Sequence, residues 1–133
     1  MFKVVYINCD VVPFLDRIMA LGDEPVKDLE TRTRNMLRAV LDSPVLLAET
    51  RCGRRPIIRC WATFGQPVVV RSRDELETYL KRACIPAGSR YDWQPGTKVK
   101  YLYPIRNVRP CAPHVIPKDA PIIRHGRTWA ELI

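Results

Sequence analysis

Two short runs of β-branched and aromatic residues, separated by a turn, constrain the fold of this chain more than any other feature. The runs cover residues 44–50 and 56–64, and the segment between them contains Gly53, which suits a tight turn. This pattern predicts a β-hairpin, because such a short connection joins antiparallel strands. We therefore expect an antiparallel sheet.

The rest of the chain alternates between further strand patterns and short helical patterns. Strands are expected where β-branched or aromatic residues cluster or alternate, at residues 2–7, 67–70, 98–108 and 127–132. Helices are expected from apolar spacing or from start and stop signals, at residues 10–21, 33–41 and 72–84. The last of them begins with a capping box in which Ser72 precedes Glu75. Four prolines in residues 110–121 predict a long irregular loop.

This order of elements predicts an α+β fold. Strands separated by short helices at uneven spacing do not follow the regular βαβ rhythm of a parallel sheet. We expect a small, mainly antiparallel, barrel-like sheet with two or three short helices. A chain of 133 residues has the usual length of one domain, so residues 1–133 are expected to form a single one.

Several classes of protein are disfavoured by the sequence. The longest apolar runs are far short of the ~20 residues that a membrane-spanning helix needs. The first ten residues lack the cleavage pattern of a signal peptide, so we expect a cytoplasmic protein. The five cysteines are irregularly spaced, and the two histidines do not complete a zinc site, which predicts five reduced thiols, no metal and no cofactor. Among them, Cys60 is expected to be a small core residue.

The charge of the chain favours a polyanionic partner. The net charge is +8, and of the 22 basic residues 16 are arginine. A basic surface attracts nucleic acids through counterion release, and the planar guanidinium pairs with phosphate and stacks on bases. The alternative is a basic surface that only keeps the protein in solution.

A charged motif lies between the first two expected helices, with the spacing Gly22-x-x-x-x-Lys27-x-x-Glu30-x-Arg32. It resembles the signature of the ASCH domain family, Gly-x-Lys-x-x-Glu-x-Arg, within the PUA-like superfamily. The three charged positions match that signature, whereas Gly22 lies five residues before the lysine rather than two. The order of early helix, motif, hairpin, later helix and closing strands is also similar to that family.

The resemblance implies a PUA-like sheet and a role in RNA binding. Some relatives are hydrolases, including ribonucleases and small amidohydrolases that remove the acetyl group of N4-acetylcytidine. In those amidohydrolases the lysine acts beside a threonine, at the position that is Glu30 here, and a carboxylate does not replace a hydroxyl nucleophile. They also use an acid of the later helix, which would lie near Glu75 or Glu77.

The motif also has the chemistry of a site in its own right. In an extended segment Glu30 and Arg32 share one face, and a bend after Lys27 brings all three together. A lysine among arginines has a lowered pKa and acts as a base or nucleophile, whereas a lysine beside Glu30 stays protonated and binds phosphate. Lys27 and Glu30 are therefore candidate catalytic residues, and Arg32 and Arg34 are candidate ligand-binding residues. The alternative is an ion-pair cluster that only holds the segment in place.

A later loop adds aromatic residues in basic surroundings. Tyr91 and Trp93 follow Arg90 and precede Lys98, an arrangement that fits a platform on which RNA bases stack. The alternative is that the two rings plug an open end of the sheet. The segment 124–127 is a weaker candidate for orienting an anion, with a solvated loop as the alternative.

Three functions follow from these observations. The first is an RNA- or nucleotide-binding module whose pocket is lined by Lys27, Glu30, Arg32 and Arg34. The second is a hydrolase that uses the same pocket on a modified nucleoside or an RNA phosphodiester. The third is a protein-interaction domain with a basic face. A concave pocket around Lys27 and Glu30 favours the first two, and a flat apolar patch favours the third.

Overall fold

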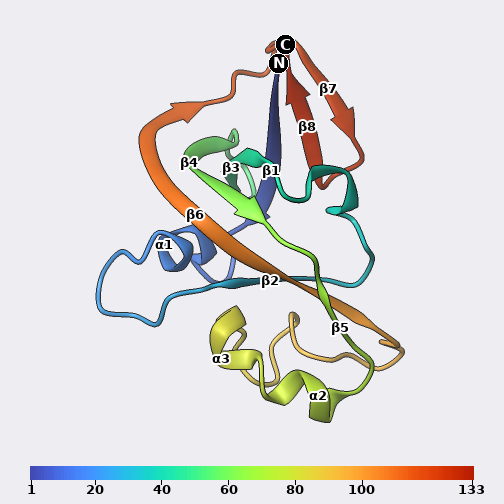
Figure 1. The fold of residues 1–133 in the computed structure, drawn as a ribbon. Helices are drawn as coiled ribbons and strands as arrows, with labels where there is room; N and C mark the ends of the chain where they lie inside the picture. Colours follow the sequence, from blue (N-terminus) through green and yellow to red (C-terminus); the bar gives the residue numbers. More distant parts are fainter.

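Eight strands and three short α-helices make up the computed structural model, which describes residues 1–133 (Figure 1). The strands are β1 (Phe2–Asn8), β2 (Leu29–Arg32), β3 (Pro44–Thr50), β4 (Ile57–Phe64), β5 (Val68–Val70), β6 (Lys100–Val115), β7 (Ile122–His125) and β8 (Trp129–Leu132). The helices are α1 (Phe14–Ile18), α2 (Arg73–Glu77) and α3 (Leu80–Ala83), and η1 (Arg38–Val40) is a 3₁₀ turn.

The strands form one mixed sheet in the order β2-β6-β4-β3-β1-β8-β7, with β5 paired to β6. Only β1 and β3 run parallel, and every other pair is antiparallel. The end strands β2 and β7 do not pair with each other, so the sheet is curved but not closed. The predicted α+β class, the mainly antiparallel sheet and the hairpin over residues 44–64 are confirmed.

The long strand β6 bends the sheet and joins its two halves (Figure 1). Its first five residues pair with β2 and with β5, and its remaining residues pair with β4. The predicted irregular loop is wrong at its start, because β6 continues through Pro110 and Pro113 to Val115. This part of β6 pairs with β4 alone, so a proline there can interrupt hydrogen bonding on one side only.

The predicted helix over residues 33–41 is wrong, since the structure has only the 3₁₀ turn η1 there. The phenol of Tyr103 organises this segment: it donates to Asn35 Oδ1 at 2.6 Å and accepts from the Leu37 N–H at 3.4 Å. Leu37 and Val40 are buried against the sheet in this irregular form. Contacts with β6 therefore override a weak helical preference.

The other two predicted helices are present in part. The helix expected over residues 10–21 is reduced to α1, which begins after Pro13. The expected N-cap is present, because Ser72 Oγ accepts a hydrogen bond from the Glu75 N–H at 3.1 Å, but the Glu75 carboxylate does not return a bond to the Ser72 N–H as a full capping box requires. The helix that follows breaks after Glu77 and resumes as α3.

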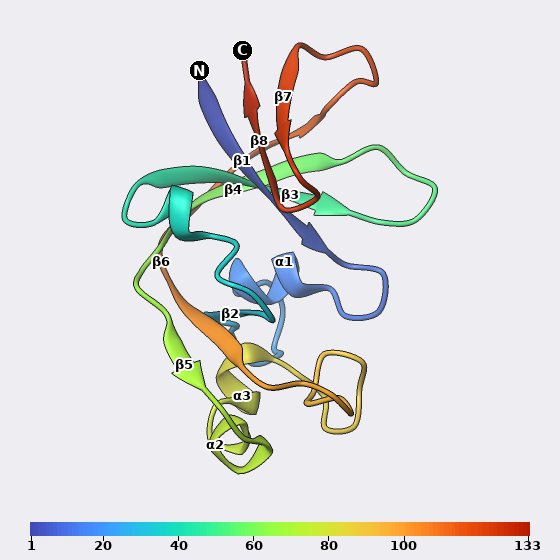
Figure 2. The same cartoon turned by 90° about the vertical axis from the view of Figure 1, so that its right-hand side faces the viewer.

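Three apolar clusters hold these elements together. The largest packs α1 and the 36–41 segment against one face of the sheet. A second packs α2 and α3 against β2, β5 and β6, at the end of the molecule opposite β7 (Figure 2). The third contains Leu46 of β3 and Ile58 of β4. All five cysteines are free, and Cys60 is buried as predicted, which raises the pKa of its thiol to about 12.

None of the helices is long and apolar enough to cross a membrane.

Candidate functional site

The structure brings Lys27, Glu30 and Arg32 together in a chain of ion pairs centred on Glu30. Lys27 Nζ lies 3.5 Å from Glu30 Oε1, and an Arg32 guanidinium nitrogen lies 3.2 Å from Glu30 Oε2. Glu30 and Arg32 alternate with Thr31 along β2 and so share one face, as an extended segment requires. Lys27 precedes the strand, and its ammonium group contacts the carboxylate oxygen opposite to the one that Arg32 contacts.

Lys27 is buried between two helices. Its Nζ donates to the Ala83 carbonyl at the end of α3 at 2.6 Å, and lies 4.5 Å from the centroid of the Phe14 ring of α1. The Lys27 N–H donates to the Arg17 carbonyl at 3.0 Å, which fixes the backbone as well. Only 1% of the residue is exposed, so its ammonium group contacts protein rather than solvent.

Burial and charge act in opposite directions on the two buried groups. Burial lowers the pKa of the Lys27 ammonium, and the Glu30 carboxylate only partly offsets this. Burial alone would raise the pKa of the Glu30 carboxyl, but the charges of Lys27 and Arg32 and the N–H of Thr31 outweigh it, and the pKa lies below its usual value. Glu30 is therefore a carboxylate at neutral pH.

Glu30 and Arg32 line a cavity of about 490 Å³, and Lys27 does not. The wall is formed by β1, β2 and the end of β3, by the first residue of α1, by the 33–36 segment, by the start of β6 and the loop before it, and by the turn between β7 and β8. Its lining residues are Tyr6, Ile7, Asn8, Phe14, Glu30, Thr31, Arg32, Thr33, Met36, Thr50, Arg90, Tyr91, Lys100 and Arg127.

Four basic side chains and one acid line this cavity. Lys100 is engaged by the protein, because its Nζ donates to the Tyr91 and Asp92 carbonyls, and burial lowers its pKa. Arg32 shares the carboxylate of Glu30 and also donates to the Tyr6 carbonyl at 3.0 Å. The other two basic residues, Arg90 and Arg127, are exposed at the mouth of the cavity and form no ion pair. The cavity is positively charged.

Both aromatic candidates, Tyr91 and Trp93, pack against the second apolar cluster, but only Tyr91 lines the cavity. Tyr91 lines the cavity, with its ring 5.0 Å from that of Phe14 in an edge-to-face arrangement and its hydroxyl 3.3 Å from Asn8 Oδ1. Trp93 lies outside the cavity and packs against the second apolar cluster. Arg34 and Lys98 are exposed and also lie outside the cavity.

The acids of the later helix do not reach the cavity. Glu75 and Glu77 are both exposed on α2, and Glu77 pairs with Arg73 of the same helix. No acid of the later helix therefore lines the cavity wall.

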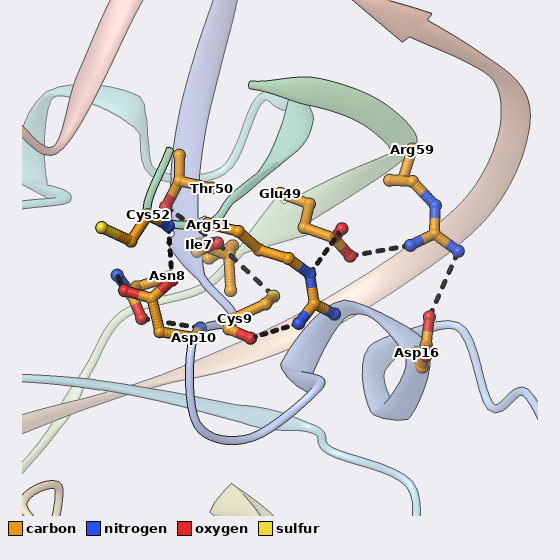
Figure 3. A network of polar contacts seen from close by, with 10 residues as sticks. All are labelled: Ile7, Asn8, Cys9, Asp10, Asp16, Glu49, Thr50, Arg51, Cys52 and Arg59. Atoms are coloured by element: carbon orange, nitrogen blue, oxygen red, sulfur yellow. Dashed lines mark hydrogen bonds and ion pairs between the residues drawn. The ribbon is translucent and has the colours of Figure 1, made fainter. Parts of the chain in front are cut away.

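A second polar network, which the sequence did not indicate, supports the cavity from β3 (Figure 3). The buried carboxylate of Glu49 accepts from Arg51 at 3.1 Å and from Arg59 at 2.9 Å. Arg59 continues to Asp16 of α1 at 3.2 Å, and Arg51 donates to the Cys9 carbonyl at 2.8 Å. These contacts fix the ends of β1 and β3, where the cavity residues Asn8 and Thr50 stand in register.

Asn8 and Thr50 could not be recognised from the sequence as cavity residues. They meet because β1 and β3 pair in parallel, and the 35 residues between these strands form no regular crossover helix. Parallel pairing has no short-range signal comparable to a hairpin turn. Arg127 did have a weak signal, since it lies in the basic segment 124–127.

Known proteins resemble this chain in structure, whereas neither family models nor curated sequences match it. Among solved structures, an ASCH protein of Zymomonas mobilis superposes with a TM-score of 0.61 at 20% identity, covering 84% of this chain and 71% of that one. A serine-to-alanine mutant of the Zymomonas mobilis ASCH protein gives a TM-score of 0.62 at 19% identity, over 85% of this chain and 72% of that one.

These superpositions agree with the ASCH-like fold that the sequence predicts and with the observed order of strands and short helices. The chain has an α+β fold like that of these ASCH structures.

Proposed function

We propose that this protein is an RNA- or nucleotide-binding module whose ligand enters the cavity lined by Arg32 and Tyr91. The observation that carries the proposal is the composition of that cavity, which combines two arginines that form no ion pair, Arg90 and Arg127, with the rings of Tyr6 and Tyr91 in a volume of about 490 Å³. Cationic groups bind phosphate and aromatic faces stack on bases. An ASCH-like fold is compatible with RNA binding.

The remaining candidates take different parts in this proposal. Glu30 and Arg32 are the motif residues that a ligand in the cavity touches. Lys27 does not line the cavity; its role is to keep Glu30 ionised and in place. Arg34 and Lys98 are exposed outside the cavity, where they serve a longer RNA by contacting its phosphates.

The proposal predicts salt-dependent binding of single-stranded RNA. Each phosphate contact adds about 0.7 to the slope of log affinity against log salt, so a few contacts give a measurable slope in fluorescence anisotropy. Arg32→Gln is expected to lower affinity about tenfold and to reduce the slope by about 0.7, because it removes one cation from the cavity wall.

Arg54→Gln is the matched control, since Arg54 is exposed in the β3–β4 turn and outside the cavity. Thermal melting of both variants shows whether each is folded at the assay temperature. If neither RNA nor nucleotides bind at low salt, the basic face belongs to a protein-interaction domain instead.

A hydrolase using the same cavity is the second candidate, and the ionised carboxylate of Glu30 on the cavity wall favours it. Such a carboxylate is placed to orient a water molecule or accept its proton. With N4-acetylcytidine and single-stranded RNA as substrates, Glu30→Gln is expected to abolish product formation. Absence of product from the unmodified protein leaves the binding module as the function.

A further inference from the structure

Arg90 is held at the mouth of the cavity by neutral groups alone. One of its terminal nitrogens donates to Asn8 Oδ1 at 3.1 Å and to Tyr91 Oη at 2.8 Å, and the guanidinium lies 4.9 Å from the centroid of the Tyr91 ring. These contacts orient the side chain and leave its other N–H groups without protein acceptors. The guanidinium is pre-organised and forms no ion pair; the charge of Asp10 acts on it from a distance, while that carboxylate accepts from the Cys52 N–H and the Asn8 amide.

Arg127 approaches the same cavity from a distant part of the chain, the turn between β7 and β8. The turn is tied to β1, because the Tyr6 N–H donates to the Thr128 carbonyl at 2.9 Å. Arg127 itself makes no hydrogen bond or ion pair through its side chain. Its guanidinium is therefore available to a ligand.

Other arginines near the cavity differ in this respect. Arg51 and Arg59 share the buried carboxylate of Glu49, and Arg32 is paired with Glu30. The charge of Glu30 is already matched by Lys27 and Arg32, so it does not neutralise the two arginines at the mouth.

We infer that Arg90 and Arg127 form a phosphate subsite, so that the cavity selects phosphorylated nucleosides over free nucleosides. This inference rests on the proposed function and names the ligand class of that site. Two guanidinium groups with free N–H donors recognise phosphate oxygens through charge-assisted hydrogen bonds. Tyr91, whose ring already stacks under Arg90, contacts the adjoining uncharged part of the ligand.

The test compares each of the four nucleosides with its 5′-monophosphate and with the matching dinucleoside monophosphate, by isothermal titration calorimetry. We expect the monophosphate to bind at least about tenfold more tightly than the nucleoside. A mononucleotide ligand shows this preference with the monoester, whereas an RNA ligand shows it with the phosphodiester as well. Arg90→Gln and Arg127→Gln are each expected to lower the monophosphate-to-nucleoside affinity ratio about tenfold.

Arg124→Gln is the control for net charge, because Arg124 is exposed on β7 and does not line the cavity; its ratio should equal that of the unmodified protein. An unmodified protein that binds nucleosides and monophosphates equally would overturn the phosphate subsite and leave the proposed function standing. Ratios that fall equally in all three arginine variants would also overturn it. Absence of binding by nucleosides, nucleotides and RNA alike would overturn both proposals.

Discussion

Lys27→Met is expected to lower the free energy of unfolding by about 3 kcal/mol, because removing one member of a buried ion pair leaves the other buried and only partly compensated. Lys27 is 1% exposed and Glu30 is 6% exposed, and only Arg32 would remain beside the carboxylate. The Ala83 carbonyl would lose its donor as well. Urea denaturation followed by circular dichroism measures the change.

The double variant Lys27→Met/Glu30→Gln separates a charge effect from a packing effect. It buries no ion in the place of the pair, so most of the lost stability should return. Lys98→Met is the control for lysine removal, since Lys98 is exposed and unpaired, and it should change stability by less than about 0.5 kcal/mol. Equal stabilities of the Lys27 and Lys98 variants would contradict the burial of the pair.

A loss of binding or turnover after Lys27 truncation would combine a change in stability with a change in function. Substitutions of Arg90 and Arg127 are the more direct tests, because these side chains line the cavity, are exposed and form no ion pair.

Trp93→Ala is expected to lower the free energy of unfolding by about 2–3 kcal/mol and to leave the affinity for RNA unchanged. The indole is half-buried against the second apolar cluster, which joins α2 and α3 to β2, β5 and β6. Removing it leaves that cluster open to water at its edge. Trp93 does not line the cavity, so no ligand contact is lost.

Trp93→Phe is the matched variant, because it keeps an apolar ring in the same place and should retain most of the stability. Denaturation and RNA anisotropy measured on the same preparations distinguish the two roles of the residue. A fall in affinity without a change in stability would mean that the indole stacks on an RNA base instead of packing against the apolar cluster.

Local patterns in the sequence determined the elements whose structure depends on near neighbours. The hairpin of β3 and β4 forms where two β-branched runs flank a glycine-containing turn. The helix α2 begins where the Ser72 hydroxyl can accept a hydrogen bond from the Glu75 N–H. The spacing of the charged motif predicts that Glu30 and Arg32 share one face of β2, because side chains two residues apart in a strand point to the same side.

Only the tertiary structure decided the elements and residues that depend on distant partners. Residues 33–41 are irregular because Tyr103 of β6 binds Asn35 and Leu37, and β6 passes through its prolines because β4 pairs with one side of it. The cavity gathers Arg32, Arg90 and Arg127 from three separate parts of the chain. The physical reason is the same in each case: the bend of β6 and the parallel pairing of β1 with β3 place side chains together through backbone hydrogen bonds, which no local spacing records.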